Sequence, residues 1–464
     1  MRLYERLAGD LETLIRDGTL SAGARAPSIR ALCRERAISP ATVVRAYELL
    51  EARGVLESRA RSGFFVTGGA PAPPHPPQAR LSERVEVSQL VFQILEATRQ
   101  RDCVPLGSAF PSPELFPLRQ LGRHLAFVAQ KLDPWSTVED LPPGSLMLRR
   151  QIAQRYRLGG AEVAPEEIII TAGGLEALNL ALQVVTAPND IVAIESPSFY
   201  GCLQAIERSG RQAVEIPTTP EHGLDLEVLE RTLRDVPVKA CWFMTTFHNP
   251  LGTSMPAASK EQLVRMLAAR QIPLIEDNVY AELYFERERP RITKVWDQAG
   301  WVLDCGSFAK TLAPGYRLGW VAAGRFAAAV RQSKITTSLA TSIPIQAAIS
   351  RYLETGVYDR HLAKLRRTLQ RQQTQLVAAL EMYFPPRCRW LCPAGGYQLW
   401  VQLPEGADAL ELHARALEHN ISVAPGPIFS ARREFARALR LNYGHPWTAE
   451  TERAIKVLGK LIGR

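Results

Sequence analysis

The sequence comprises 464 residues, enough for two or three compact domains at roughly 100 to 200 residues each. Hydrophobic residues make up 46% and charged residues 22%, which is typical of a globular protein and excludes a fibrous or wholly disordered chain. Uninterrupted apolar runs stay well short of the roughly 18 residues that a membrane span needs, and the charged N-terminus lacks a secretory signal. We therefore expect a cytoplasmic protein without a membrane partner.

Cysteine usage and net charge add two further expectations. The seven cysteines form an odd, scattered set, which favours reduced thiols over a disulfide framework. Cys388 and Cys392 are spaced like a pair of metal ligands, but no second pair of cysteine or histidine residues lies near them in the sequence, so we expect no metal site. The net charge of +9 is compatible with a polyanionic partner without demonstrating one.

A proline-rich segment divides the chain. Residues 68–78 read GGAPAPPHPPQ, which cannot continue a helix or a central strand and is typical of a semi-rigid polyproline spacer. We therefore expect an N-terminal domain over residues 1–67, a spacer over residues 68–87 and a body over residues 88–464. Within the body we place a large subdomain at about residues 120–330 and a small one at about residues 331–464.

The N-terminal domain carries three helical patterns. Leucines at three- and four-residue steps from Leu3 to Leu14 predict one helix, and a second begins after Pro27. In the third helix Ser39 suits the N-cap and Pro40 the first turn. The predicted core face holds Val43, Ala46, Tyr47 and Leu50, and the outward face holds Ala41, Thr42, Arg45 and Glu48.

Two strand-like runs, residues 55–57 and 64–66, flank a basic tip and predict a hairpin. Helices followed by such a hairpin are typical of a winged helix-turn-helix, in which the second helix of the pair enters the major groove of DNA. Residues 1–67 carry eleven arginines against eight acidic residues, and the excess lies between residues 25 and 61, where phosphate would be contacted. A small helical docking domain with a solvated charged face fits the same pattern.

Short motifs in this domain resemble a known DNA-binding family. GARAPSIR (residues 23–30), SPAT (39–42), RAY (45–47), GVL (54–56) and SG (62–63) are similar to the GntR-type winged-helix domain over nearly its whole length. The resemblance implies a double-stranded DNA operator as partner. The DNA contacts that it implies are Arg30, Ser39, Thr42, Arg45 and, in the wing, Gly63.

Four segments of the body place polar residues directly after buried strands. They are EIIITAGG (residues 167–174), ACWFM (240–244) before FHNPLG, PLI (273–275) before EDNVY, and VLDC (302–305) before GSFAKTLAPGYRLG. Strands alternating with helical stretches, such as residues 175–185, indicate an α/β sheet. Ligands of such sheets bind at the carboxyl ends of the strands, so we expect these polar residues to meet there.

The residue types at these strand ends fit pyridoxal 5′-phosphate. Lys310 follows a buried strand among small residues, and amines in such places form Schiff bases with carbonyl compounds, although a lone buried lysine is more often structural. Asp277 can pair with a protonated pyridine nitrogen, and an arginine together with backbone amides can hold a phosphate. The glycine pair at residues 173–174 fits a plain tight turn equally well by itself, and the combination favours the cofactor.

The four segments resemble the fold type I aminotransferases. Together with the N-terminal domain they resemble the MocR subfamily of GntR-type regulators over nearly the whole chain, and SFAK (residues 307–310) is the most specific piece. The resemblance implies an α/β body with a smaller C-terminal α+β subdomain, pyridoxal 5′-phosphate as cofactor and a homodimer.

The resemblance also implies individual roles in the cofactor site. Lys310 would form the Schiff base, and Asp277 would pair with the pyridine nitrogen. Asn249 and Tyr280 would bind the ring hydroxyl oxygen. The phosphate would be held by Gly174, Leu175, Ser307 and Arg317. Phe199 would stack on the ring, a place that adjacent Tyr200 takes after a one-residue slip.

Arg440, within LRLN (residues 439–442), matches the arginine that pairs with the substrate carboxylate; a surface arginine is the alternative. A planar, permanently charged guanidinium suits a carboxylate, so the expected ligand is an amino acid or a related carboxylated amine. Two functions remain open. The first is a transcriptional regulator that senses such a compound or the cofactor itself, and the second is a working aminotransferase with an appended docking module.

Overall fold

The structure is a computed structural model that describes residues 3–16, 20, 23–36, 38–59, 63–67, 80–82, 87–97, 103–136 and 141–463. The chain divides into two compact units, residues 1–78 and 79–464. Most of the expected spacer, residues 68–79 and 83–86, lies outside the described residues. Residues 80–82 were also expected in the spacer, but they form strand β3 (Arg80–Ser82), because their backbone pairs with the edge of the sheet in the second unit.

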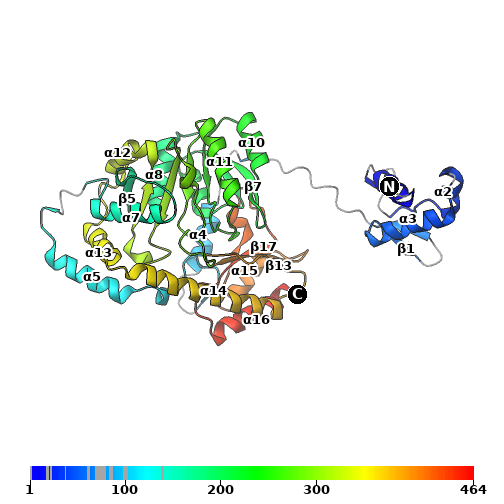
Figure 1. The fold of residues 1–464 in the computed structure, drawn as a ribbon. Helices are drawn as coiled ribbons and strands as arrows, with labels where there is room; N and C mark the ends of the chain where they lie inside the picture. Colours follow the sequence, from blue (N-terminus) through cyan, green and yellow to red (C-terminus); the bar gives the residue numbers. More distant parts are fainter. Residues whose placement is uncertain are drawn as a thin grey trace. The chain divides into compact units, whose positions relative to one another are not determined.

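The described residues of the N-terminal unit form three helices and a hairpin (Figure 1). They are α1 (Leu3–Arg16), α2 (Ile29–Arg36), α3 (Pro40–Ala52) and the antiparallel strands β1 (Leu56–Arg59) and β2 (Gly63–Val66). Ser39 caps α3 as predicted, because its hydroxyl accepts the Thr42 backbone N–H at 3.3 Å. Tyr47 donates its hydroxyl to the Pro27 carbonyl, which ties α3 to the start of α2. The four predicted core residues of α3 are all buried.

The body is built on one mixed sheet with the strand order β3-β7-β6-β9-β10-β11-β12-β5 and with β8 on β7. The further strands are β5 (Ile168–Thr171), β6 (Ile191–Ser196), β7 (Gln212–Thr219), β8 (Gly223–Leu224), β9 (Val238–Phe243), β10 (Leu274–Asp277), β11 (Val302–Ser307) and β12 (Gly319–Ala322). Strands β7, β6, β9, β10 and β11 are parallel, and β12 is antiparallel to both β11 and β5. The carboxyl ends of β5, β9, β10 and β11 therefore lie along one edge, as predicted.

Helices cover both faces of this sheet. They are α7 (Leu146–Leu158), α8 (Gly174–Val185), α9 (Tyr200–Arg208), α10 (Leu226–Asp235), α11 (Ala257–Ala269), α12 (Ala327–Thr337) and α13 (Ile343–Glu354). Outside this layer, α4 (Ser88–Ala97) packs on α9 and α5 (Leu118–Lys131) packs on α13. Successive strand residues face opposite sides. Accordingly Ile194 packs in the cluster that contains α8 and α9, whereas Ala193 packs in the cluster that contains α10 and α11. On that second side Ile168 and Ile170 pack with α7 and α13.

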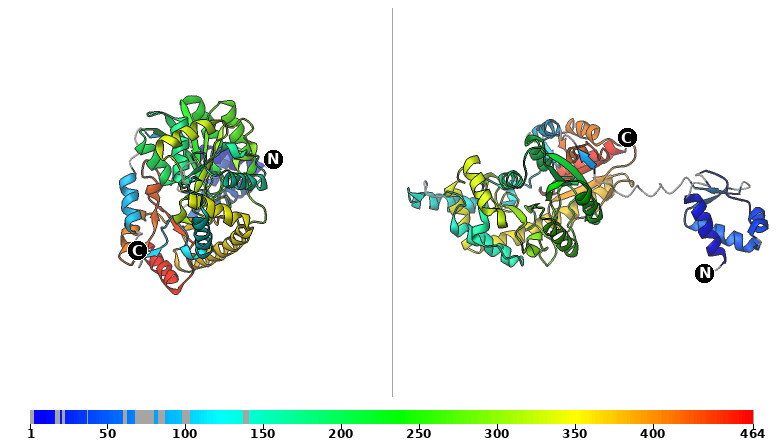
Figure 2. Two further views of the ribbon diagram at one scale, coloured as in Figure 1. Left: turned by 90° about the vertical axis from the view of Figure 1, so that its left-hand side faces the viewer. Right: turned by 90° about the horizontal axis from the view of Figure 1, so that it is seen from above.

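A smaller α+β part follows along the long helix α14 (Val357–Tyr383), which runs from α13 towards α16 (Ala449–Ile462) in Figure 1. Its sheet has the order β13 (Arg389–Trp390), β14 (Gln398–Gln402), β17 (Ala438–Asn442) and β16 (Ala424–Pro425). Helix α15 (Ala409–Leu417) packs on α16, as both views of Figure 2 show in orange and red. Strand β4 (Val104–Pro105) joins this part by pairing with β15 (Ile421–Ser422).

The boundary that the sequence placed near residue 331 falls inside α12. Helix α12 packs on α8, and α13 packs on α5 and α7, so both belong with the large sheet. The chain passes to the smaller part only along α14. Among the helices of the described residues, none is long and apolar enough to cross a membrane.

Truncation of Leu50 tests whether the N-terminal unit depends on its own core. Leu50 is fully buried in that core, so Leu50→Ala is expected to lower the free energy of unfolding of this unit by about 2–5 kcal/mol. Hydrogen exchange of the α3 amides in the full chain measures the change. Glu48→Ala, an exposed position on the same helix, should stay within about 0.5 kcal/mol of the parent. Equal exchange in the two variants would contradict this packing.

Candidate functional site

A cavity of about 1280 Å³ opens at the carboxyl ends of the parallel strands. All four predicted segments contribute to its wall, which confirms that the sheet brings them together. Its lining includes Gly174, Leu175, Phe199, Asn249, Asp277, Tyr280, Ser307, Lys310 and Arg317. The cofactor-binding residues predicted from the sequence therefore share one cavity.

Lys310 lies just beyond β11 with its amine inside this cavity. Its Nζ donates to the Ala109 carbonyl at 2.8 Å and lies 3.8 Å from the centre of the Phe110 ring. Burial lowers the pKa of Lys310 from 10.5 to about 7, although Asp277 opposes the shift. A substantial fraction of the amine is therefore neutral near pH 7, as a nucleophile requires.

Asp277 ends β10 and is only 2% exposed. Its Oδ1 has no hydrogen-bond partner within the described part of the chain. Burial raises the pKa of this carboxyl group from 3.8 to about 7. A buried acceptor left unpaired is costly, and a protonated ring nitrogen would supply the missing charged donor. This orphaned oxygen fits the pyridine nitrogen of pyridoxal 5′-phosphate.

An anion cradle lies where β5 turns into α8. Gly173 caps the helix with φ of 96°, and a Cβ there would lie 2.7 Å from Nη2 of Arg317. The glycine therefore lets the guanidinium approach the helix start, where Nη2 donates to the Ala172 carbonyl at 3.2 Å. Backbone N–H groups of Gly174 and Leu175 open the helix, and such a terminus binds phosphate. Ser307 adjoins the cradle, since its Cβ would lie 3.4 Å from a Cβ on Gly174.

Asn249 and Tyr280 occupy the wall near Arg440. The Asn249 side-chain oxygen accepts from Nη1 of Arg440 at 3.1 Å, and the Tyr280 hydroxyl accepts from Nε2 of Gln398 at 3.1 Å. Arg440 is fully buried, so the alternative of a surface arginine is wrong. Its Nη2 donates to the carbonyls of Gly107 at 2.6 Å and Ser108 at 3.2 Å, which places it beneath a loop of the cavity wall.

Two aromatic rings meet at the start of α9. Phe199 is the N-cap residue and Tyr200 the first helical residue, and their ring centres lie 4.8 Å apart at an angle of 52°. Both rings line the cavity. Phe199 is half-buried, whereas Tyr200 is buried and packs near Phe429. The structure thus places both alternatives for the stacking residue in the same wall.

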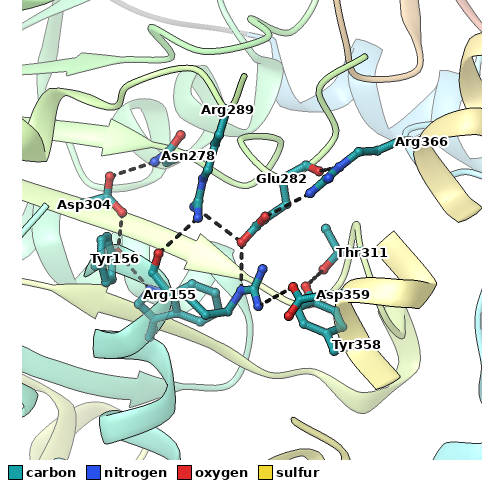
Figure 3. A network of polar contacts seen from close by, with 11 residues as sticks. Arg155, Tyr156, Asn278, Glu282, Arg289, Asp304, Thr311, Tyr358, Asp359 and Arg366 are labelled. Atoms are coloured by element: carbon teal, nitrogen blue, oxygen red, sulfur yellow. Dashed lines mark hydrogen bonds and ion pairs between the residues drawn. The ribbon is translucent and has the colours of Figure 1, made fainter. Parts of the chain in front are cut away.

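A network of partly buried ion pairs, which the sequence analysis missed, supports these loops (Figure 3). Glu282 lies two residues after Tyr280 and accepts from Arg155 at 2.9 Å, from Arg289 at 3.4 Å and from Arg366 at 3.4 Å. Burial alone would raise the pKa of Glu282, but Arg289 and Arg155 hold it below its usual value. The carboxylate therefore stays charged and pins the chain beyond Tyr280.

The same network reaches the residues that follow Asp277 and Lys310 (Figure 3). Asn278 donates to Asp304 at 2.9 Å, and Asp304 also accepts the Tyr156 hydroxyl. On the other side Tyr358 donates to the side chain of Thr311 at 2.8 Å. These partners are more than twenty residues apart in the chain, so their spacing carries no signal that sequence reasoning could have used.

The N-terminal unit presents the predicted DNA contacts on its surface. Arg30, Ser39, Arg45 and Gly63 are exposed and Thr42 is half-buried. Ser39 and Thr42 also bind each other through their hydroxyl oxygens at 2.9 Å, within the cap of α3. Residues 60–62 of the predicted wing tip lie outside the described residues. The N-cap and first turns of α3 thus carry three of the five predicted contacts: Ser39, Thr42 and Arg45.

The described residues form no candidate metal site. Within the described parts of the chain, no group of three or more His, Cys, Asp or Glu side chains is placed to hold a metal ion. All seven cysteines are free thiols.

Comparison with known proteins gives matches for both units. Residues 141–458 match the family "Aminotransferase class I and II", and residues 3–66 match "Bacterial regulatory proteins, gntR family". The chain is 45% identical to the uncharacterized HTH-type transcriptional regulator YdcR of Escherichia coli K12 over 464 residues, which span all of this chain and 99% of that protein. It is 30% identical to aromatic-amino-acid aminotransferase 1 of Thermococcus litoralis, over 80% of this chain and 91% of that protein.

Solved structures agree with the fold of the body. The multiple substrate aminotransferase of Thermococcus profundus superposes with a TM-score of 0.74 at 27% identity, covering 82% of this chain and 95% of that one. The α-aminoadipate aminotransferase LysN of Thermus thermophilus gives a TM-score of 0.73 at 28% identity, covering 82% and 95%. The predicted fold class is thereby confirmed, and the cofactor of this fold is pyridoxal 5′-phosphate. The chain belongs to the class I and II aminotransferase family and joins its aminotransferase body to a DNA-binding domain of the gntR family, the arrangement of the MocR-type regulators.

Proposed function

We propose that the protein regulates transcription in the cytoplasm by binding a double-stranded DNA operator through α3 and the hairpin. The body would sense an amino acid, a related carboxylated amine or pyridoxal 5′-phosphate itself. The observation that carries this proposal is that one chain joins the exposed Arg45 face of a capped helix to a complete cofactor cavity.

The residues of the cavity divide the work of holding the cofactor. Pyridoxal 5′-phosphate supplies a ring that withdraws electrons from a bound amine. Asp277 would keep the ring nitrogen protonated, because its unpaired Oδ1 gains a charged donor there. Lys310 would supply the amine that binds the cofactor and that an incoming amino compound displaces. Arg317, with the amides of Gly174 and Leu175, would hold the phosphate, and Ser307 would adjoin it.

The remaining roles fall to Arg440, which lies behind the cavity wall, and to Asn249, Tyr280 and Phe199, which line it. Arg440 would pair with the ligand carboxylate, and its contact with Asn249 orients the guanidinium. Asn249 and Tyr280 would bind the ring hydroxyl oxygen, and Phe199 would stack on the ring. The alternative function, a working aminotransferase with an appended docking module, uses the same residues. The whole-length similarity to a protein named as a transcriptional regulator favours the sensor.

A homodimer is part of the proposal. Among the described residues from the start of α5 to the first turn of α7, six large apolar side chains are exposed: Leu118, Phe127, Trp135, Leu141, Leu146 and Met147. Apolar side chains gathered in one segment favour association with another protein surface. A second copy of this chain is the partner that the aminotransferase family suggests.

Operator titrations test the sensing function directly. We expect the operator affinity of the cofactor-free, cofactor-bound and amino-acid-bound protein to differ by about 5- to 150-fold, the range of typical allosteric coupling. Duplexes from the neighbourhood of the gene provide the operator. Identical operator affinities in all three states, together with sustained transamination by the protein with a keto acid as amino-group acceptor, would favour the aminotransferase instead.

The ionisation of Lys310 predicts how cofactor attachment depends on pH. The amine attacks only when neutral, and a pKa of about 7 makes the neutral fraction rise from about a tenth at pH 6 to about nine tenths at pH 8. The attachment rate, followed by visible absorption, should rise about tenfold over this range and then level off. A rate that still climbs towards pH 10, as for a solvated lysine, would refute the assignment. Lys310→Ala is the control, since borohydride should then fix no cofactor to this peptide.

Arg45 tests the DNA-binding face. Arg45→Ala should weaken operator binding by about 1–3 kcal/mol if the side chain contacts a base edge, while the cofactor absorption stays intact. Arg371→Ala removes the same charge from an exposed position on α14 and should leave operator affinity unchanged. Titrations on specific and random duplexes distinguish a base contact from a phosphate contact. Unchanged affinity of the Arg45 variant on both would exclude α3 as the recognition helix.

A further inference from the structure

The cavity wall includes residues that the cofactor does not require. Ser88, Gln204, Glu207 and Arg208 line it together with the residues around Lys310. Ser88 opens α4, and the other three lie on α9. The cavity is thus bounded in part by the contact between these two helices.

One carboxylate oxygen makes three hydrogen bonds across this contact. Oε2 of Glu207 accepts the backbone N–H of Val87 at 3.1 Å, the backbone N–H of Ser88 at 3.0 Å and the hydroxyl of Ser88 at 2.8 Å. The first N–H groups of a helix lack partners within the helix, and a negative charge is favourable at that end. Val87 and Val91 are fully buried beside α9 in the same apolar cluster. Glu207 therefore clasps the start of α4 to α9.

Helix α9 joins the clasp to the cofactor wall. Phe199 and Tyr200 stand at its start and Glu207 near its end, a separation of about 10 Å along one short helix. Arg208 adds a second route, because its Nη2 donates to the side chain of Asn179 at 2.9 Å, and Asn179 donates to the Leu175 carbonyl at 2.7 Å. The clasp is thus connected to both the stacking aromatics and the phosphate cradle.

The clasp also holds the part of the body that follows the spacer sequence. Helix α4 is the first helix after residues 68–79, and β3 pairs with β7, the strand that directly follows α9. The segment after the spacer is therefore held at two places, by β7 through β3 and by α9 through α4. Glu207 therefore contacts the first described helix that follows the spacer sequence.

Resting on the proposed function, we propose that Glu207 is a positioning residue that makes α4 part of the ligand cavity and thereby couples the ligand to DNA binding. A ligand shifts an equilibrium only when it contacts two arrangements differently. A ligand that touches Ser88 gains this contact only while Glu207 holds α4, so it stabilises the clasped arrangement. By thermodynamic linkage, loss of the clasp must weaken ligand binding.

The test compares Glu207→Ala with Glu207→Gln, which keeps one acceptor oxygen, and with Glu227→Ala. Glu227 is an exposed carboxylate in the first turn of α10, so it matches the charge change at a helix start outside the cavity. The probe is N-(5′-phosphopyridoxyl)-L-leucine, a cofactor–amino acid adduct whose binding needs no bond to Lys310. Hydrogen exchange of residues 88–97 reports on α4, and adduct affinity and operator affinity are measured on the same full-length proteins.

In the parent and in Glu227→Ala, we expect the adduct to slow exchange in α4 relative to the cofactor-free protein. In Glu207→Ala, α4 should exchange rapidly with or without adduct, the adduct should bind about fivefold or more weakly, and the adduct should no longer change operator affinity. Glu207→Gln should fall between the two. If Glu207 only stabilised the fold, its substitution would leave the adduct able to change operator affinity by the same factor as in the parent.

Two failures are distinguishable. If α4 of Glu207→Ala is protected by the adduct as strongly as α4 of the parent, the positioning role is overturned, even where operator affinity responds. If the parent shows the expected protection of α4 but its operator affinity ignores the adduct, the sensing function fails for this ligand, and the coupling through Glu207 fails with it.

Discussion

Burial of Asp277 and Lys310 at the ends of the neighbouring parallel strands β10 and β11 is the constraint on which the rest of the site depends. Burial raises the pKa of the carboxyl group and lowers that of the amine, so both lie near 7. Their mutual attraction opposes the two shifts without cancelling them. The cavity therefore holds a nucleophilic amine and an acceptor oxygen that lacks a donor. Pyridoxal 5′-phosphate would supply a partner to both groups, an aldehyde for the amine and a ring nitrogen for the oxygen.

Such a pair is costly to keep in place, and the surrounding network supplies the rigidity. Glu282 forms ion pairs with three arginines, and Asp304 accepts hydrogen bonds from Asn278 and Tyr156. Removing one arginine from this partly buried cluster would leave the Glu282 carboxylate with less compensating charge. The loops after Asp277 and Lys310 therefore have few alternative arrangements, because each one would expose or orphan a charge.

Helix α9 gives the body a second layer of organisation. One end carries the aromatic residues of the cofactor wall, and the other carries Glu207, which satisfies backbone donors at the start of α4. The movement of both ends is restricted, because α9 packs against the central sheet through Leu203 and Ile206. A family that uses its cavity for chemistry needs only the first end, whereas a regulator also needs a path towards its DNA-binding unit.

The local features of this protein were determined by the sequence alone. Ser39 and Pro40 specify the start of α3, the period of Val43, Ala46, Tyr47 and Leu50 specifies its buried face, and the runs before Asp277 and Lys310 specify buried strands. The motifs around Lys310 were enough to predict the cofactor and its cavity, because the carboxyl ends of parallel strands must meet at one edge.

Only the tertiary structure decided which distant residues hold that cavity together. The pairing of Arg155 with Glu282, the depth of Arg440, the extension of the body to β3 and the contact of Glu207 with Ser88 join segments up to hundreds of residues apart. Charged residues such as Glu207 look like solvated surface in the sequence, since periodicity reports which face of a helix is buried but not which donor lies opposite a carboxylate. Long-range pairing is set by how whole elements pack, and that information exists only once the chain has folded.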